Sequence, residues 1–387
     1  MNIIQVCPYD LSIPGGVQTH VAHLSNHLVK KNHNVLVISP STKHSAKINR
    51  IDAEVCPLTE SRRIGIWGTS IDISYLNASE RGRFSTIVEQ FKPDVVHFHT
   101  IWNPVMQFQM LYMLNGAVTK VATFHDTPPD TGLGKYIGGN LMKLGSGYVI
   151  DKLDESISVS ESQARAMGYE PGDYPPCFRV IPNGIDNTII REVKDAGARH
   201  EPGFTLIFIG RFEERKGIFD LLQVFRKLKA EHPGRKLNLH VVGNGPLEPN
   251  IRRFIDKHNL TGVTLFRDVD DPKKLELLGA ADLLAAPSLY GESFGIVLLE
   301  AMAMGVKVVG YGNEGYLNIG REYGVENFPE PGNRDKLYAR IRRHILQPET
   351  TEHLIEKGFE IARRHDWKRI TNRIERVYRN GNDAREY

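Results

Sequence analysis

Two glutamates eight residues apart, Glu292 and Glu300, have the type and spacing to bind one polar ligand together. The run between them changes from small loop-forming residues to an apolar stripe, which predicts a helix beginning near Phe294. Eight residues at about 100° each return a side chain to nearly the same helix face. Both carboxylates could then face a ligand with phosphates at one end, near a helix N-terminus, and sugar hydroxyls at the other. The alternative is an ordinary helix with one capping and one solvated glutamate.

Two cations, Arg211 and Lys216, stand between a predicted strand and the helix that should follow it. Arginine offers a bidentate fork and lysine a compact point charge, so together they can neutralise a diphosphate. Ligands of parallel α/β sheets bind at the carboxyl ends of the strands, where this loop should lie. The sequence therefore indicates a phosphate site, with a solvated charged loop as the alternative.

A glycine pair, Gly15 and Gly16, comes after the first predicted strand and immediately before a predicted helix. Two residues without side chains would let a phosphate approach the N–H groups of the helix N-terminus. A plain tight turn is the alternative. The loop lacks the G-x-G-x-x-G pattern that is typical of nicotinamide and flavin sites, so it does not indicate a site of that kind.

Three histidines occupy positions set by predicted strands. His125 directly follows one strand, whereas His97 and His99 alternate within another and should share one of its faces. We do not expect His97 and His99 to bind a metal, because no third ligand is evident near them. The glycine turn 243–246, before a later helix, is expected to be structural.

Short apolar runs alternate with helical patterns along almost the whole chain, which indicates βαβ units and parallel sheets covered on both faces. Helices are predicted at Val17–Lys31, Arg81–Phe91 and Gln163–Gly168. The breaker-rich stretch Glu170–Pro176 predicts a linker between two domains. The predicted strands are Ile3–Cys7, Asn34–Ser39, Asp94–Phe98, Lys120–Phe124, Ser156–Ser160, Arg179–Ile181, Phe204–Ile209, Leu237–Val242, Val263–Phe266, Asp282–Ala286 and Val306–Gly310.

Composition narrows the class of protein. A chain of 387 residues with 41% hydrophobic and 25% charged residues is typical of a globular protein of two domains. A net charge of +3 gives no indication of nucleic-acid binding. No apolar run reaches the roughly 18 residues of a membrane span, and the N-terminus enters a strand and not a signal peptide. Three scattered cysteines predict neither a disulfide framework nor a zinc site, so we expect a cytoplasmic protein.

Six motifs follow one another in an order that resembles family-4 retaining glycosyltransferases of the GT-B fold, over essentially the whole chain. Within that family the chain is most similar to bacterial phosphatidylinositol mannosyltransferases, in segments 7–18, 291–298 and 269–274. The motifs are Pro14-Gly15-Gly16, His125, Asn183-Gly184-Ile185-Asp186, Gly210-Arg211…Lys216-Gly217, Gly243-Asn244-Gly245-Pro246 and Glu292-x7-Glu300.

The resemblance implies an α/β protein of two doubly wound Rossmann-like domains facing across a cleft. Residues 1–175 would form the acceptor-side domain and residues 176–365 the domain that binds the nucleotide sugar. The helical segment 366–387, which contains Trp367, would cross back to the first domain.

The resemblance also implies a role for each matching residue. His125, Glu292, Arg211 and Lys216 would form the catalytic set, without a metal or other cofactor. Tyr9, Gln18 and His125 would lie on the acceptor side. The donor diphosphate would contact Gly15, Gly16, Arg211 and Lys216. Asp271 and Lys274 would lie near guanine, and Glu300 would bind the ribose. Glu292 would bind the transferred sugar, with Phe294 and Gly295 beside that sugar.

The implied function is transfer of a hexose, mannose from GDP-mannose, to a lipid-linked or glycan-precursor acceptor. Segment Gly310–Tyr316, which should flank the donor sugar, departs from the family pattern, so a UDP-sugar donor stays an alternative. A sugar-nucleotide epimerase and a non-catalytic nucleotide-sugar-binding protein are weaker alternatives. Segment Ser61–Trp67 combines two arginines with Ile and Trp, and could hold a cytoplasmic protein at the inner membrane face; an ordinary surface loop is the alternative.

Overall fold

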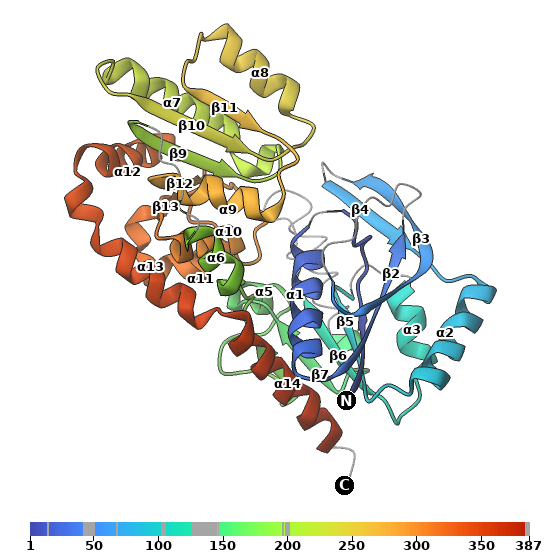
Figure 1. Cartoon of the computed structure of the whole chain (residues 1–387). Coiled ribbons are helices and arrows are strands. Elements are labelled where there is room, and N and C mark those ends of the chain that lie inside the picture. The colour runs from blue at the N-terminus through green and yellow to red at the C-terminus, as the bar shows by residue number, and fades with distance from the viewer. Residues whose placement is uncertain are drawn as a thin grey trace. The chain divides into compact units, whose positions relative to one another are not determined.

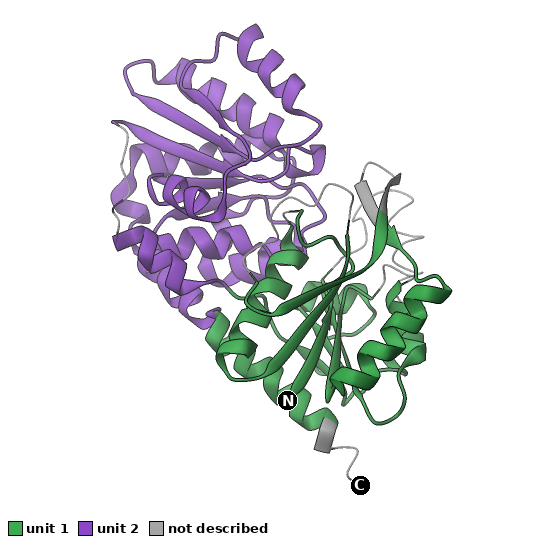
Figure 2. Cartoon of the chain, turned by 45° about the vertical axis from the view of Figure 1, so that its right-hand side comes forward, with its two compact units in different colours: residues 1–128, 132–184, 367–387 green, residues 129–131, 185–366 purple. Residues whose placement is uncertain are grey.

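The chain forms two compact units (Figure 2). A computed structural model describes residues 1–13, 15–41, 51–66, 69–101, 106–125, 145, 147–195, 197 and 202–383. Unit 1 comprises residues 1–128, 132–184 and 367–387, and unit 2 comprises residues 129–131 and 185–366. The division after residue 184 lies beyond the expected linker, because the strand that follows this linker pairs within unit 1.

Unit 1 is built on an eight-stranded sheet of order β4-β3-β2-β1-β5-β6-β7-β8 (Figure 1). Neighbouring strands are parallel except for the antiparallel pair β3 and β4. The strands are β1 (Asn2–Val6), β2 (Asn34–Ser41), β3 (Glu54–Ile66), β4 (Thr69–Ser74), β5 (Val95–His99), β6 (Thr119–Phe124), β7 (Glu155–Ser158) and β8 (Phe178–Val180). The helices are α1 (Gly16–Lys30), α2 (Ala78–Phe91), α3 (Met106–Met113), α5 (Glu161–Ala166) and α14 (Trp367–Asp383).

Unit 2 is built on a five-stranded parallel sheet of order β11-β10-β9-β12-β13. Its strands are β9 (Phe204–Ile209), β10 (Leu237–Val242), β11 (Val263–Phe266), β12 (Leu283–Ala286) and β13 (Lys307–Gly310). Its α-helices are α6 (Asn187–Asp195), α7 (Ile218–Glu231), α8 (Glu248–Lys257), α9 (Asp271–Gly279), α10 (Ile296–Met304), α11 (Glu314–Tyr323), α12 (Arg334–Leu346) and α13 (His353–Arg364). Short 3₁₀ turns are η1 (Glu214–Lys216), η2 (Val325–Asn327) and η3 (Pro348–Thr351).

Both sheets are doubly wound, as the alternating pattern predicted. The chain passes outward from β1 to β4 and then returns to β5 on the other side of β1. In unit 2 it passes outward from β9 to β11 and returns to β12 on the other side of β9. Each predicted strand overlaps an observed one. The reversal points, β1/β5 and β9/β12, are where such sheets bind ligands.

The hairpin of β3 and β4 was not predicted from the sequence. Segment Ser61–Trp67 was proposed as a membrane contact, with an ordinary surface loop as the alternative; residues 61–66 belong to β3, where Ser61 pairs with Ser74, and not to a loop. Polar and apolar residues alternate irregularly here, so the strand left little pattern in the sequence. The side chains of Arg62 and Arg63, and all of Trp67, lie outside the described residues. Over the described part of the chain, no helix is both long and apolar enough to cross a membrane.

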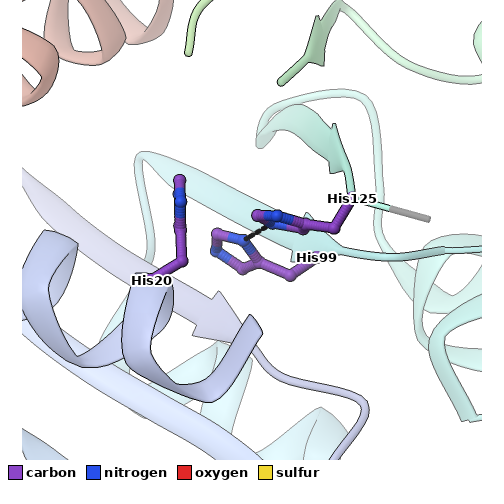
Figure 3. Close-up of side chains that lie close together, drawn as sticks. All are labelled: His20, His99 and His125. Carbon is purple, nitrogen blue, oxygen red and sulfur yellow. Dashed lines mark hydrogen bonds between the residues drawn. The ribbon is translucent and has the colours of Figure 1, made fainter. Parts of the chain in front are cut away.

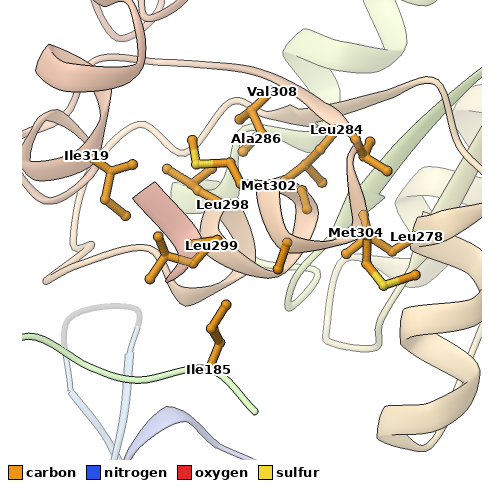
Figure 4. Packing of buried hydrophobic residues seen from close by; sticks show 14 of the residues in the cluster. Ile185, Leu278, Leu284, Ala286, Leu298, Leu299, Met302, Met304, Val308 and Ile319 are labelled. Carbon is orange, nitrogen blue, oxygen red and sulfur yellow. The ribbon is translucent and has the colours of Figure 1, made fainter. Parts of the chain in front are cut away.

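Helix α10 is the centre of the larger unit 2 core (Figure 4). It is apolar almost all round, the pattern of a helix buried on every side. Leu298 and Leu299 are completely buried, among side chains from β12, β13 and neighbouring helices. This packing fixes where α10 begins, and therefore where the loop that precedes it can run.

Helix α14 belongs to the core of unit 1. Its residues Trp367, Ile370, Ile374, Val377 and Tyr378 recur at helical spacing and are all buried. They pack in one cluster with side chains of α1 and β1. The helix at the end of the chain is thus part of the same compact unit as its beginning.

Candidate functional site

The carboxyl edge of the five-stranded sheet gathers the charged residues of unit 2. Its strands are all parallel, so the loops that follow them leave the same edge. The loop after β9 holds Arg211 and Lys216, and the loop after β12 holds Glu292. The Leu289 N–H donates to the Arg215 carbonyl at 2.7 Å and joins the two loops. This edge includes the β9/β12 reversal point.

Lys216 and Glu292 form an ion pair at the centre of a charged network. Arg215 lies 3.6 Å from the same Glu292 oxygen. Glu213 accepts from Arg215 Nε at 2.9 Å and lies 3.1 Å from Arg211 Nε. Three cations and two carboxylates leave a formal charge of +1. This excess stands directly before the positive N-terminus of α7, so the network is suited to an anion.

Close backbone approach holds this network in place. A Cβ at Gly217, whose φ is +67°, would overlap the Pro287 carbonyl oxygen. A Cβ at Gly315 would overlap the Glu292 carbonyl oxygen. The loop after β12 is therefore enclosed between the start of α7 and the start of α11, with no space for either side chain.

The segment 310–316 supports the Glu292 loop from inside the unit. Asn313 caps α11 by accepting from the Tyr316 N–H at 2.9 Å, and its amide donates to the Ser288 carbonyl at 2.8 Å. The Tyr316 hydroxyl lies 3.1 Å from the Ser288 hydroxyl. Burial raises the pKa of Tyr316, and the nearby Glu292 carboxylate raises it further, so the phenol is neutral.

Glu300 is the single charged residue of α10 and forms an ion pair with Lys274. Lys274 Nζ lies 2.9 Å from Glu300 and 2.9 Å from Asp271. Burial alone would lower the pKa of Lys274, but the Glu300 and Asp271 carboxylates raise it above its usual value. The ammonium is therefore charged and holds both carboxylates. Asp270 is a helix cap, because its side chain accepts from the Lys273 N–H at 2.9 Å.

The β1/β5 reversal in unit 1 carries the other predicted residues. Gly15 caps α1 in extended backbone, and a Cβ there would collide with the Gln18 side chain. A Cβ at Gly16 would meet nothing within 4 Å, so folding does not require glycine at that position. Gln18 is buried and its amide donates to the Asp10 carbonyl at 3.5 Å. Tyr9 packs partly buried against the core, and Pro14 lies outside the described residues.

Three histidines meet at the same edge of the sheet (Figure 3). His20 comes from α1, His99 from the end of β5, and His125 follows β6. His99 Nδ1 and His125 Nε2 lie 3.2 Å apart. His97 hydrogen-bonds to Thr123 and to Tyr378 of α14, each at 2.7 Å. The sequence showed no third ligand near His97 and His99, but the fold brings His20 and His125, which are distant in sequence, to His99; His97 does not belong to this group.

The motif 183–186 connects this cluster to neighbouring elements. The Asn183 side-chain oxygen lies 2.8 Å from His20 Nδ1. A Cβ at Gly184 would overlap the Trp367 indole, which packs edge-on against His20 with centroids 4.8 Å apart. Asp186 caps α6 by accepting from the Thr188 N–H at 2.9 Å. The motif therefore has a structural role in this protein: it contacts His20 and Trp367 and caps α6.

Two protein families match consecutive parts of the chain. Residues 14–188 match the family described as "Glycosyltransferase Family 4", and residues 190–361 match the one described as "Glycosyl transferases group 1". The chain belongs to glycosyltransferase family 4. It is therefore a glycosyltransferase.

Relatives match this family 4 enzyme along its length. A phosphatidyl-myo-inositol mannosyltransferase of Mycolicibacterium smegmatis is 28% identical, over 98% of this chain and 93% of its own. A sucrose-phosphate synthase of Thermosynechococcus elongatus has a similar structure, with a TM-score of 0.75 at 17% identity over 99% of both chains. Anabaena HepE, solved with UDP and glucose, has a TM-score of 0.71 at 19% identity, over 97% of this chain and 99% of its own. The two sheets are those of the GT-B fold.

In this family 4 enzyme the structure joins some predicted residues directly and places others apart. Lys216 contacts Glu292, and Lys274 contacts both Asp271 and Glu300. Arg211 reaches the network through Glu213. Phe294 packs in the core, so its ring points away from solvent. The next residue, Gly295, adopts a φ of +97°.

Sequence reasoning missed the residues that link the predicted ones. Glu213 and Arg215 lie in the loop after β9, but their spacing resembled an ordinary charged loop. His20 stands four residues after Gly16 on the buried face of α1, a weak signal that could have been noticed. Tyr316 was noted only as part of the atypical segment 310–316, because its contact with Ser288 depends on how α11 packs.

Proposed function

We propose that this family 4 enzyme is a retaining transferase that moves mannose from GDP-mannose to a lipid-linked or glycan-precursor acceptor. The observation that carries the proposal is the Lys216–Glu292 pair at the β9/β12 reversal. It sets a cation suited to phosphate beside a carboxylate suited to sugar hydroxyls. The mannose assignment is supported by the likeness to phosphatidyl-myo-inositol mannosyltransferases along the whole chain.

The nucleoside of the donor is assigned to Asp271, Lys274 and Glu300. Glu300 would accept from ribose hydroxyls, and Asp271 from the N1–H and exocyclic amine of guanine. Both carboxylates are held by Lys274, so neither needs to be reoriented by the ligand. The more exposed Asp271 side chain, 58% accessible, suits contact with a base, and the largely buried Glu300 suits a fixed sugar.

The diphosphate is assigned to Arg211, Lys216 and the N-terminus of α7. Arg211 is half exposed, and the network already carries one excess positive charge. In unit 1, Gly15 and Gly16 would offer the first turn of α1 to an anion. Breaking the anomeric bond places negative charge on the leaving diphosphate, and fixed cations and helix N-termini stabilise that charge.

The transferred sugar is assigned to Glu292 and His125, and the acceptor to Tyr9 and Gln18. Glu292 is read as a binding residue and not as half of a glycosidase acid/base pair, because it is already held by Lys216 and Arg215. Burial lowers the pKa of His125 well below its usual value, and so do neighbouring histidines. The ring is therefore neutral and would contact the sugar by hydrogen bonding.

A UDP-sugar donor is the second candidate. Two observations favour it: the segment 310–316 departs from the family pattern with buried Tyr311 and Tyr316, and HepE was solved with UDP and glucose. An epimerase has no comparable support, because family 4 and group 1 transferases match both units.

A nucleotide screen by thermal unfolding separates these donors. A ligand at 100 times its Kd stabilises the native state by about 2.7 kcal/mol, so GDP should raise the midpoint by about 5 °C or more. UDP and ADP should raise it less. Stabilisation by UDP and not by GDP would replace the mannose assignment, and no response to any nucleotide would contradict the donor site itself. Lys274→Ala, which releases Glu300 and Asp271, should reduce the GDP response.

A further inference from the structure

We infer that His20, His99 and His125 form a binding site for a divalent transition metal such as Zn²⁺. One ring nitrogen from each residue lies within 4.8 Å of the other two. The three rings come from α1, β5 and the end of β6 and lie close together, with His20 beside the hydrogen-bonded pair of His99 and His125 (Figure 3). Three protein ligands with one open position are the usual arrangement of zinc sites that also bind a water or a ligand.

The spacing of the nitrogens is close to what zinc requires. Tetrahedral ligands at 2.0–2.1 Å from zinc lie about 3.3 Å from one another. His99 Nδ1 and His125 Nε2 are 3.2 Å apart already. All three ligand nitrogens lie within 4.8 Å of one another, so binding zinc requires the His20 ring to approach the other two by at most about 1.5 Å.

Hydrogen bonds on the far side of two rings prepare the nitrogens that face inward. Asn183 offers its oxygen to His20 Nδ1 at 2.8 Å, and Gln5 offers its oxygen to His99 Nε2 at 2.7 Å. An oxygen acceptor fixes the proton on the outer nitrogen, so His20 Nε2 and His99 Nδ1 carry lone pairs. Metal-bound histidines are held in this way by outer partners.

The inward nitrogen of His20 is otherwise unexplained. Among the described residues, His20 Nε2 is buried and has no hydrogen-bond partner. The side chains of His20, His99 and His125 are all at least nine-tenths buried. A buried polar atom without a partner costs free energy, which a metal ion would remove.

All three rings are neutral, and His125 Nε2, which donates to the unprotonated His99 Nδ1, binds a metal once its proton moves to His125 Nδ1. Burial lowers the pKa of His20 to about 4, with the Asn183 hydrogen bond opposing it. Burial and neighbouring histidines also lower the pKa of His99 and of His125. Neutral imidazoles bind Zn²⁺, Co²⁺, Ni²⁺ and Cu²⁺ without first losing a charge.

The test is metal binding by the full chain in the absence of donor and acceptor. Titration calorimetry should give one Zn²⁺ per chain, and Co²⁺ as a probe should give the visible absorption of a tetrahedral complex. His20→Gln and His125→Gln should each abolish both signals. The matched controls His23→Gln and His27→Gln, on the same helix α1, should retain them.

A second variant keeps the inference open to refutation where a histidine variant does not fold. Asn183→Ala leaves all three ligands but removes the partner of His20 Nδ1, and should weaken Zn²⁺ binding about 10–100-fold. Absence of a tetrahedral Co²⁺ spectrum in the wild type would overturn the inference. So would a spectrum that persists in both His20→Gln and His125→Gln, because the metal would then lie elsewhere.

One consequence concerns transfer and rests on the proposed role of His125. A metal bound to His125 would withdraw that ring from the sugar, so saturating Zn²⁺ should inhibit transfer at least tenfold in the wild type. EDTA should restore the rate. Zn²⁺ binding without inhibition would leave the metal site standing and would contradict the sugar contact of His125.

Discussion

At the scale of single residues, the charged groups that we propose for the donor site pair with one another. Lys216 is occupied by Glu292, and Glu300 by Lys274. A largely buried charge without a partner is costly, so each pair stabilises both of its charges. The same pairing means that removing Lys216 leaves the Glu292 carboxylate without its closest cation at the place proposed for phosphate.

Gly16→Ala tests whether the backbone at the start of α1 approaches a ligand. A Cβ at this position meets nothing within 4 Å, so the thermal midpoint should stay within about 2 °C of the wild type. If a phosphate approaches the first turn of α1, the methyl group should raise the Kd for the donor about tenfold. Unchanged donor affinity measured by calorimetry would mean that Gly16 has no contact with it.

At the scale of elements, α11 sets the position of Glu292. Gly315 lies in its first turn against the Glu292 carbonyl, and Asn313 caps the same turn. A helix is a rigid support, so a small change at its start moves the loop it touches.

Gly315→Ala should therefore lower kcat/KM by about 100-fold, because a displacement of about 1 Å at a residue that positions the substrate has this order of effect. The matched control is Gly82→Ala in α2, where a Cβ meets nothing within 4 Å. That control should retain activity and gain about 0.5–1 kcal/mol of stability, as glycine is unfavourable inside helices. Steady-state kinetics of both variants decide the point, and full activity in Gly315→Ala would disprove the support role.

The sequence predicted the elements better than the contacts between them. Parallel strands such as β9 to β11 are apolar runs bounded by breakers, and their ends were placed to the residue. The β3–β4 hairpin was missed, because it lies at the edge of the eight-stranded sheet and has no continuous apolar run. Lys216 and Glu292 were each singled out, but their direct contact depends on how β9 and β12 pair. The histidine cluster joins residues up to 105 positions apart, which no local pattern reveals.

At the scale of the whole molecule, stability should depend on buried neutral histidines. Burial lowers the pKa of His20 to about 4 and of His344 to about 3, and lowers those of His97, His99 and His125. The unfolded chain binds these protons near pH 6.5, so between pH 6.5 and 4 it takes up more protons than the folded chain. Stability is therefore complete above pH 6.5 and falls as the pH falls.

The thermal midpoint should accordingly drop steadily from pH 7.5 to pH 5. Full protonation of unfolded His20 alone corresponds to about 3 kcal/mol by pH 4. His20→Gln should show a shallower drop than the wild type, because one of the buried groups is gone. A midpoint that does not change over this range would contradict neutral burial of the cluster.

The whole protein combines two GT-B sheets with a charged network at one reversal point and a histidine cluster at the other. Calorimetric titration of GDP and GDP-mannose into the wild type, Lys216→Ala and Glu292→Gln tests the proposed donor site most directly. Lys216→Ala leaves the Glu292 carboxylate to repel phosphate, so both ligands should bind at least tenfold more weakly. Glu292→Gln should bind GDP as tightly as the wild type but lose the added affinity for GDP-mannose. Equal binding of both ligands by all three proteins would contradict the site.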